Sequence, residues 1–559
     1  MKPLMTSRPL RVARRLAKLR RVAIDLSRRQ LLGASGAAIA SAAISAPLAP
    51  TWESLAASYR VPDWFRDAKF GIWAHWGPQC EPEFGDWYAR LMYMQHRQSW
   101  QQSETPYENH LRRYGHPSRT GFIDIIGQWK AEAWQPEELL RRYVKAGARY
   151  FMAMGCHHDN FDLFASKHHE WNSTRVGPKR DIVGTWAPLV REAGLKFGIS
   201  NHSSHAWHWY QPAYGYDAEG PMRGRRYDAY WLRKKHGRGK YWDGLDPQEL
   251  YTGPYYVPPA GIMSGGEMDA WHDKRDGQWL EAAPPGNMRF VEKWLLRQNQ
   301  LVDDYRPDLI YFDDTGLPLG QAGLDAAAHY YSKAKAWDRD VVIFGKKLEG
   351  LQRRAIVEDV ERGFVDGIRP EPWQTDTCIG NWHYDRRLYD DGGYKSAKQV
   401  IQRLADVVSK NGNLLLNIPV RGNGTIDDQE EAILDQIAAW MNRNGEAIYG
   451  TRPWRVFGEG PTKPPSGMLN EDEAKPFTAK DMRFTSKGSE LHVFFMDPPT
   501  SEARITSLGA AALAGGTIEQ IRFEDGRPLQ FTHAADALHV MIPPGDLVPR
   551  VTIRGRGLF

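Results

Sequence analysis

The chain has 559 residues, of which 42% are hydrophobic and 25% are charged, a length and composition typical of a soluble protein with more than one domain. Its formal net charge of +5 arises in the first thirty residues, which hold ten Lys or Arg and a single Asp. The rest of the chain has 63 basic and 67 acidic residues, a net charge of −4, which argues against a nucleic-acid partner.

The first 49 residues have the pattern of a twin-arginine export signal. Arg28 and Arg29 precede an uncharged run of small and apolar residues, 31–46, and these are the elements of such signals. The run is shorter than the roughly 20 residues needed to cross a bilayer, so we expect no membrane span. We expect cleavage between Ala42 and Ala49 and a periplasmic or secreted protein. The alternative is an N-terminal anchor or a disordered tail.

Beyond residue 60, short apolar stretches alternate with amphipathic ones. The expected strands are residues 70–74, 150–154, 197–200, 309–312, 341–344 and 414–418, and the expected helices are residues 136–146, 186–193, 288–305 and 324–337. Gly147 and Gly194 follow two of these helices, where C-cap glycines belong. Repeated βα units indicate a parallel sheet, and their number favours a (β/α)-barrel of the TIM-like α/β type over a doubly wound sheet. We assign the barrel to residues 50–448.

Two segments depart from this alternation. Residues 214–283 are rich in Tyr, Trp, Gly, Pro and charge and lack periodicity, so we expect them to form an elaborated active-site loop. After a Pro/Gly-rich link, residues 490–495, 518–523 and 538–542 alternate apolar and polar side chains. This pattern predicts a C-terminal β-sandwich domain, residues 449–559, with a structural role.

One predicted strand ends in two adjacent carboxylates, Asp313 and Asp314. Pro307 ends the preceding helix, and residues 309–312 form an apolar run directly before the two acids. Enzymes with a (β/α)-barrel keep their chemistry at the carboxyl ends of the strands. Asp313 is therefore a candidate catalytic residue, although an Asp at a strand end also caps turns.

Histidine and tryptophan recur at several expected strand ends. Examples are His75 and Trp76, His157 and His158, and His202. Sugar-binding sites combine aromatic faces with directed hydrogen-bonding groups, and this combination favours a carbohydrate site over isolated structural histidines. Adjacent residues on a strand face opposite ways, so His157 and His158 are not expected to share an ion. We expect neither a metal nor a cofactor.

The chain resembles the α-L-fucosidases of glycoside hydrolase family 29. The matching segments are collinear and cover roughly residues 55–450: FGIWAHWG (70–77), GDWY (85–88), HHDNFDLF (157–164), WNS (171–173), VGPKRDIVG (176–184), AGLKFGIS (193–200), RPDLIYFDD (306–314) and SKNGNLLLNIPVRGNGTI (409–426). The resemblance implies a retaining mechanism in which Asp313 is the nucleophile. Asp314 should point to the opposite face of the strand, where it would cap a turn or support the active-site residues.

The resemblance also implies a set of substrate-binding residues: His75, Trp76, Asp86, Trp87, His157, His158 and Trp171. Asp86 occupies the position where the family usually has Glu. It keeps the negative charge but has a shorter side chain. The expected substrate is a fucosylated oligosaccharide or glycoconjugate.

The general acid/base departs from the family pattern. Family members usually carry it as the Glu of a Trp-Glu-Thr motif, whereas this chain has Gln374 between Trp373 and Thr375. An amide cannot donate and recover a proton, so the remaining candidates are Glu361 and Glu371, or both are surface carboxylates. The leading interpretation is an exo-acting α-L-fucosidase. The alternatives are a catalytically silent fucose-binding protein and a retaining glycosidase of the same fold with another sugar specificity.

Overall fold

The computed structural model describes residues 48–98, 104–282, 286–500, 502–545 and 547–559. Nearly all of the predicted export signal, including Arg28 and Arg29, lies outside the described residues. Among the helices of the described part, none is both long and apolar enough to cross a membrane.

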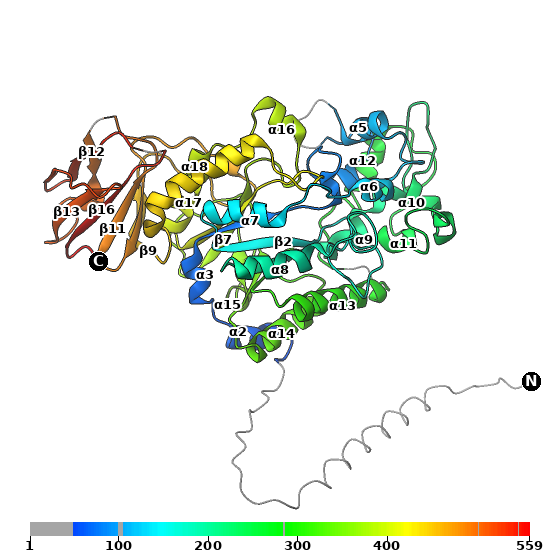
Figure 1. Cartoon of the computed structure of the whole chain (residues 1–559), viewed down its shortest axis with the longest axis horizontal. Coiled ribbons are helices and arrows are strands. Elements are labelled where there is room, and N and C mark those ends of the chain that lie inside the picture. The colour runs from blue at the N-terminus through cyan, green and yellow to red at the C-terminus, as the bar shows by residue number, and fades with distance from the viewer. Residues whose placement is uncertain (1–47, 99–103, 283–285, 501, 546) are drawn as a thin grey trace, which may run out of the picture. The chain divides into compact units, whose positions relative to one another are not determined.

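Eight parallel strands close into a barrel, and this confirms the predicted fold class (Figure 1). The strands are β1 (Phe70–Ala74), β2 (Tyr150–Cys156), β3 (Lys196–Asn201), β4 (Leu309–Thr315), β5 (Val342–Lys346), β6 (Val357–Asp359), β7 (Trp373–Cys378) and β8 (Gly412–Asn417). Each strand pairs with the next, and pairing of β1 with β8 closes the ring. Their carboxyl ends therefore meet at one rim, where the site forms.

Strands β6 and β7 were not predicted from the sequence. Strand β6 has only three residues, and β7 reads Trp-Gln-Thr-Asp-Thr-Cys without an apolar run. The polar side chains of β7 are nevertheless buried, because Gln374 and Asp376 bond to other side chains inside the barrel. An apolar pattern cannot detect a strand whose buried side chains are polar.

Long helices surround the strands: α7 (Pro136–Lys145), α8 (Ile182–Glu192), α13 (Met288–Tyr305), α14 (Gln321–Ala336), α17 (Ala397–Ser409) and α18 (Asp428–Asn444) (Figure 1). Shorter helices before β1 and near β6 to β8 are α2 (Trp52–Ser58), α3 (Asp63–Ala68), α15 (Gln352–Ala355) and α16 (Arg386–Asp391). Gly147 and Gly194 have φ of 99° and 77°, so both adopt the left-handed conformation that glycine favours after a helix.

Further short helices gather at one end of the barrel (Figure 1). They are α4 (Tyr88–Leu91), α5 (Pro106–Arg113), α6 (Phe122–Gln128), α9 (Ala206–Trp209), α10 (Asp228–Trp231), α11 (Pro247–Leu250) and α12 (Gly265–Asp273), with the 3₁₀ turns η1 (Pro78–Cys80), η2 (Ser203–His205), η3 (Gln211–Tyr214) and η4 (Lys234–Gly237). Residues 214–283, which we expected to form a loop, contain α10 to α12. Their hydrophobic pattern is weak because none of these helices exceeds nine residues.

The chain ends in two antiparallel sheets. The larger has the order β13-β16-β11-β10-β9 and the smaller β12-β15-β14. The strands are β9 (Arg452–Glu459), β10 (Met482–Lys487), β11 (Glu490–Phe495), β12 (Glu502–Ile505), β13 (Thr517–Phe523), β14 (Phe531–His533), β15 (Leu538–Met541) and β16 (Arg550–Arg556). Side chains of both sheets share one apolar core. The packing of two sheets through such a core is the arrangement of a β-sandwich.

The C-terminal region contacts the barrel domain at several places, among them helix α17 and the barrel rim. Helix α17 packs against β8 of the barrel and against β9 and β10, and the buried Arg483 donates to Asp406 of this helix at 2.6 Å. The connection between β9 and β10 also reaches the barrel rim, where the backbone N–H of Leu469 donates to the carbonyl oxygen of Glu361 at 2.8 Å. The C-terminal region thus supports the barrel wall beside Glu361.

Candidate active site

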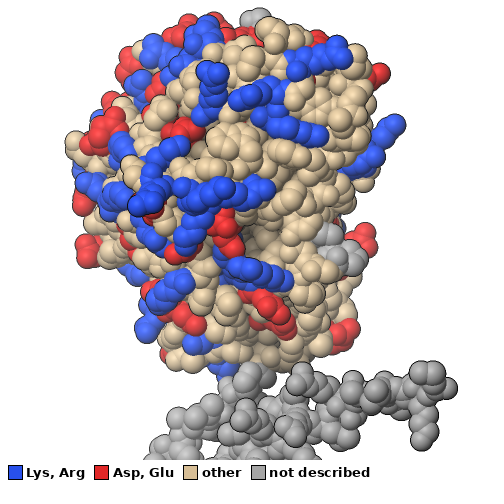
Figure 2. All heavy atoms as spheres, turned by 90° about the vertical axis from the view of Figure 1, so that its right-hand side faces the viewer, with Lys and Arg blue, Asp and Glu red and all other residues tan. Residues whose placement is uncertain are grey.

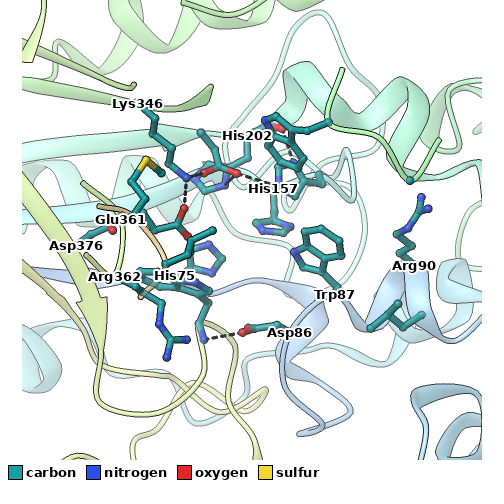
Figure 3. A pocket seen from close by; sticks show the side chains of 18 of the residues that line it. His75, Asp86, Trp87, Arg90, His157, His202, Lys346, Glu361, Arg362 and Asp376 are labelled. Atoms are coloured by element: carbon teal, nitrogen blue, oxygen red, sulfur yellow. Dashed lines mark hydrogen bonds and ion pairs between the residues drawn. The ribbon is translucent and has the colours of Figure 1, made fainter. Parts of the chain in front are cut away.

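A cavity of about 620 Å³ lies at the carboxyl ends of the barrel strands. Its lining includes Asp313 from the end of β4, Lys346 from the end of β5, and Glu361, which follows β6. The face of the molecule in Figure 2 is hollowed near its middle, and Lys and Arg side chains gather on one side of the hollow. Figure 3 shows Lys346 and Glu361 on one side of the cavity and Trp87 on the other.

Asp313 and Asp314 face different environments, as the alternation of a strand predicts. The carboxylate of Asp313 lines the cavity, where it contacts Lys346 and lies 3.2 Å from Nε2 of His158 and 3.6 Å from Nδ1 of His202. Asp314 is fully buried outside the cavity lining and pairs with His205 at 3.0 Å. Asp313 is therefore the acid that a ligand in the cavity can reach.

Lys346 joins Asp313 to a second carboxylate. Its Nζ contacts Asp313 and lies 2.5 Å from Oε2 of Glu361 (Figure 3). Two oxygens bonded to one ammonium nitrogen are separated by at most roughly 5 to 6 Å, twice the length of a charge-assisted hydrogen bond. The carboxyl groups of Asp313 and Glu361 are thus close enough to act on one glycosidic bond, as the catalytic pairs of retaining glycosidases do at about 5 to 5.5 Å.

The environments of these two carboxyl groups push their pKa values in opposite directions. Burial acts to raise the pKa of Asp313, but Lys346 and the neighbouring imidazoles hold that pKa well below its ordinary value. Burial also raises the pKa of Glu361, and Lys346 opposes this rise without cancelling it. Asp313 is thus held ionised and Glu361 is biased towards the protonated form, an arrangement that suits a nucleophile and a general acid.

The other two residues considered for the acid/base function lie outside the cavity lining. Gln374 is buried inside the barrel, where its amide donates to Asp359 at 2.9 Å and accepts from Tyr150 at 2.9 Å. Glu371 is solvent-exposed before β7. Of the two glutamates that the sequence left open, only Glu361 reaches the cavity.

Four histidines line the cavity wall: His75, His157, His158 and His202. Burial lowers the pKa of each, and most strongly for His75, His157 and His202, so these three rings are neutral. Within the described part of the chain, Nδ1 of His75 and both ring nitrogens of His202 lack a hydrogen-bond partner. Unpaired neutral imidazole nitrogens in a cavity wall can donate to or accept from sugar hydroxyls.

The expectation that His157 and His158 face opposite ways was wrong. Both line the cavity, and their ring centroids lie 4.4 Å apart. Strand β2 ends at Cys156, so the alternation of strand side chains no longer applies to the two residues that follow. Nδ1 of His157 is 2.7 Å from the amide nitrogen of Gln79, and Nδ1 of His158 is 2.8 Å from the carbonyl oxygen of His202.

Asp86 and Trp87 lie on the opposite wall. Asp86 is buried and accepts hydrogen bonds from the backbone N–H groups of Trp382 and His383 at 3.2 and 2.7 Å, so it also fixes the segment after β7. Trp87 is 39% exposed. Its ring lies nearly parallel to that of Trp279, with centroids 6.5 Å apart. These two indoles provide an apolar surface on the cavity wall.

Trp76 and Trp171, which were expected to bind substrate, do not line the cavity. The indole of Trp76 is buried against Trp129 and Trp134 and donates to the carbonyl oxygen of Arg421 at 2.9 Å. The indole of Trp171 is buried and donates to the carbonyl oxygen of Asp246 at 2.7 Å. Both side chains therefore support the surrounding loops instead of the cavity surface.

Several lining residues were not proposed from the sequence. The principal ones are Lys346, Tyr311, Asp376, Trp279, Met468 and Leu469. Lys346 had a recognisable signal, because it is polar and follows the apolar run of β5. Met468 and Leu469 belong to the connection between β9 and β10, and local sequence gives no sign that this distant segment reaches the barrel.

Two groups of lining residues have ligand atoms close enough to hold a metal ion. Within each group, His75, His157 and His202 or His158, His202 and Asp313, these atoms lie within 4.8 Å of one another. The same atoms face the space that a sugar would occupy. Neutral imidazole nitrogens and a carboxylate can equally hydrogen-bond the hydroxyl groups of a ligand.

Comparisons with known proteins find similarity to alpha-L-fucosidases. The family model described as alpha-L-fucosidase matches residues 36–446. Tissue alpha-L-fucosidase of Macaca fascicularis is 26% identical over 457 residues, 80% of this chain and 78% of the relative. Plasma alpha-L-fucosidase of Homo sapiens is 24% identical over 498 residues, 86% of this chain and 85% of the relative.

The fold is similar to that of solved structures. A structure of Thermotoga maritima alpha-fucosidase with a mechanism-based inhibitor has a TM-score of 0.64 and 24% identity, and the match covers 91% of this chain and 100% of that one. Alpha-L-fucosidase isoenzyme 1 from Paenibacillus thiaminolyticus has a TM-score of 0.58 and 20% identity, with coverage of 88% and 98%. At these identities the similarity shows the fold alone.

Proposed function

Because the chain belongs to the α-L-fucosidase family of glycoside hydrolases, we propose that it is an exo-acting, retaining α-L-fucosidase that removes terminal fucose from glycans. The observation that carries this proposal is the pair Asp313 and Glu361, which share the ammonium of Lys346. Their pKa shifts run in opposite directions, as a nucleophile and a general acid require.

The proposed reaction has two displacements. In the first, the carboxylate of Asp313 attacks the anomeric carbon of fucose while Glu361 donates its proton to the departing glycosidic oxygen. In the second, Glu361 removes a proton from water, and this water attacks the anomeric carbon and releases Asp313. Two inversions at one carbon return the original configuration.

The surrounding groups support these steps. Lys346 keeps Asp313 ionised and lies beside both carboxyl groups. The neutral rings of His75 and His202 offer unpaired nitrogens to the sugar hydroxyls. Trp87 offers an apolar face to the C–H side of a sugar ring.

The enzyme interpretation accounts for the site better than silent fucose binding does. The silent alternative arose because Gln374 replaces the usual acid/base. Glu361 supplies a carboxyl group beside Asp313, and its raised pKa is the property that a general acid needs. For compartment, Arg28, Arg29 and the uncharged run 31–46 support export by the twin-arginine route to the periplasm or the exterior.

Hydrolysis of an aryl α-L-fucoside, followed by proton NMR, tests this function. We expect turnover and the α-anomer of fucose as the first product, before mutarotation. No turnover of this activated substrate, together with retained fucose binding, would favour the silent alternative. First formation of the β-anomer would contradict the retaining mechanism. Turnover of a different aryl glycoside at a much higher rate would contradict the sugar specificity.

A further inference from the structure

A second cluster of ionisable side chains lies behind strand β4, outside the lining of the active-site cavity. It consists of His205 at the end of η2, Asp314 in β4, and Glu281 in the segment between α12 and α13. One ring nitrogen of His205 and one carboxylate oxygen of each acid lie within 4.8 Å of one another. The proposed reaction uses none of these groups.

The hydrogen bonds of the neighbouring histidine determine which nitrogen of His205 is free. Nδ1 of His208 lies 3.1 Å from the carbonyl oxygen of Asp276, so this nitrogen carries a proton and donates it. Burial lowers the pKa of His208 to about 2, so its ring is neutral and its Nε2 is an acceptor. Nδ1 of His205 lies 3.2 Å from that Nε2 and must be the donor. The lone pair of a neutral His205 is therefore on Nε2.

The free nitrogen points into the cluster and is unsatisfied there. His205 is fully buried, and its Nε2 lies 3.0 Å from Oδ1 of Asp314 without the alignment of a hydrogen bond. Among the described residues, Oε2 of Glu281 is also buried without a hydrogen-bond partner, while Oε1 accepts from the N–H of Thr315 at 3.0 Å. A buried nitrogen without an aligned hydrogen bond and a buried carboxylate oxygen without a partner thus face the same space among the described residues, which is costly without a ligand.

The remaining features of the cluster are those of a metal site. Asp314 is oriented by Ser204, whose hydroxyl lies 3.1 and 3.0 Å from its two oxygens. A hydrogen bond from the second ring nitrogen of a ligand histidine, as His205 makes to His208, is the usual support of a metal ligand. Burial acts to lower the pKa of His205 but Asp314 raises it, so a divalent cation that binds Nε2 would displace a proton there and balance the charge of the two carboxylates.

We propose that His205, Glu281 and Asp314 bind a divalent transition metal through one nitrogen and two carboxylate ligands, a donor set that suits zinc. An ion about 2 Å from each atom would place the ligand atoms about 3.5 Å apart, so the Glu281 side chain has to move only slightly.

The proposed metal has a positioning role. Glu281 lies two residues after Trp279, whose ring stacks on that of His205 with centroids 3.8 Å apart and lines the cavity. Asp314 follows Asp313 directly. A metal would therefore fasten the segment that carries Trp279 to the strand that carries Asp313, and it would not touch the substrate.

The test is the metal content of the purified full chain after incubation with zinc and removal of free ion. We expect about one zinc per chain, and an increase in Tm over the chelator-treated protein, because a ligand of the folded state stabilises it. Glu281→Gln should lose the zinc and the Tm increase. Gln is nearly isosteric with Glu, and Glu281 is partly exposed. The variant should therefore still fold, which circular dichroism checks.

Two control variants locate the ion. Glu267→Gln, in the exposed first turn of α12, should keep the zinc. His75→Gln should also keep it, since His75 belongs to a different histidine group in the cavity. Absence of zinc and of a Tm shift in the unmutated chain would overturn the proposal. So would zinc retention in Glu281→Gln, or zinc loss in His75→Gln, which would place the ion in the active-site cavity.

Discussion

Oε2 of Glu361 lies 2.5 Å from Nζ of Lys346, and the same ammonium group contacts Asp313. Without this cation, two largely buried carboxyl groups would face each other, and at least one pKa would rise because like charges repel. With it, Asp313 remains ionised while Glu361 keeps a raised pKa. The ionised state of Asp313 beside a Glu361 with a raised pKa therefore depends on Lys346.

Lys346→Met should move the pH–rate profile to higher pH. Lys346 lowers the pKa of Asp313 and also opposes the rise in the pKa of Glu361, so its loss raises both. Activity needs ionised Asp313 and is lost as the pH falls through that pKa, so the acidic limb should appear at higher pH. On the basic limb, activity is lost as Glu361 loses its proton, so this limb should also move to higher pH. Lys346→Arg keeps the charge and should show a smaller shift. An unmoved acidic limb in Lys346→Met would contradict this role.

Glu361→Ala should discriminate between leaving groups. Hydrolysis of natural glycans should fall by about 10²- to 10⁴-fold, because their departing oxygen needs a proton. Cleavage of an aryl fucoside with a good leaving group should fall far less. Glu371→Ala is the matched control, since Glu371 is exposed and lies outside the cavity lining, and both substrates should react at unmutated rates. Equal losses on both substrates in Glu361→Ala would assign the proton to another residue.

Glu471 connects the C-terminal region to the general acid. It is buried and contacts Arg362 at 2.5 Å, Lys395 at 3.0 Å and Thr377 at 2.7 Å. Burial acts to raise the pKa of Glu471, but Lys395 and Arg362 lower it to about 2. Arg362 follows Glu361 directly in the chain. The ion pair between Arg362 and Glu471 therefore fixes the backbone beside the proposed general acid.

Glu471→Gln should therefore slow hydrolysis of poor leaving groups by about 10- to 100-fold, because a small displacement of a catalytic group is costly, with a smaller effect on aryl fucosides. Asp472→Asn is the control. Asp472 contacts the same Arg362 at 3.3 Å, but its side chain is 71% exposed, and exposed pairs contribute little. If both variants behave alike on both substrates, Glu471 does not position Glu361.

The export proposal has a direct cellular test. Replacement of both Arg28 and Arg29 by Lys keeps the charge but removes the paired arginines that the twin-arginine pathway recognises. We expect the uncleaved precursor to accumulate in the cytoplasm, detected by fractionation and immunoblotting. The unmutated chain serves as the reference. Mature protein from the double variant outside the inner membrane would contradict the twin-arginine assignment.

The fold was largely predictable, because apolar strands and periodic helices repeat along most of the barrel. Helix α13 and strands β1 and β11 have the predicted bounds. Strand β7 was not predictable from hydrophobicity, since its buried side chains Gln374 and Asp376 are polar and form hydrogen bonds with partners from other strands.

The site was predictable only in part. The position of Asp313 at a strand end follows from local sequence. The choice between Glu361 and Glu371 does not, because both precede Gln374 by a short stretch, 13 and 3 residues, and only the closed barrel shows which one reaches Lys346. Trp76 could not have been excluded, because it follows the end of β1 as His158 follows the end of β2, and the alternation of strand side chains does not apply there. Leu469 could not have been found, since it comes from a different region of the fold.

The central claim is that Asp313 is the nucleophile, and the most direct measurement uses Asp313→Gly with and without azide. The variant should be inactive on an aryl α-L-fucoside, because no carboxylate remains to attack the anomeric carbon. Azide should fill the vacated space, attack that carbon once and expel the aryl leaving group. The account predicts restored turnover and β-L-fucosyl azide as the product, identified by NMR. Unmutated activity without azide, or an α-configured azide, would contradict the assignment of Asp313.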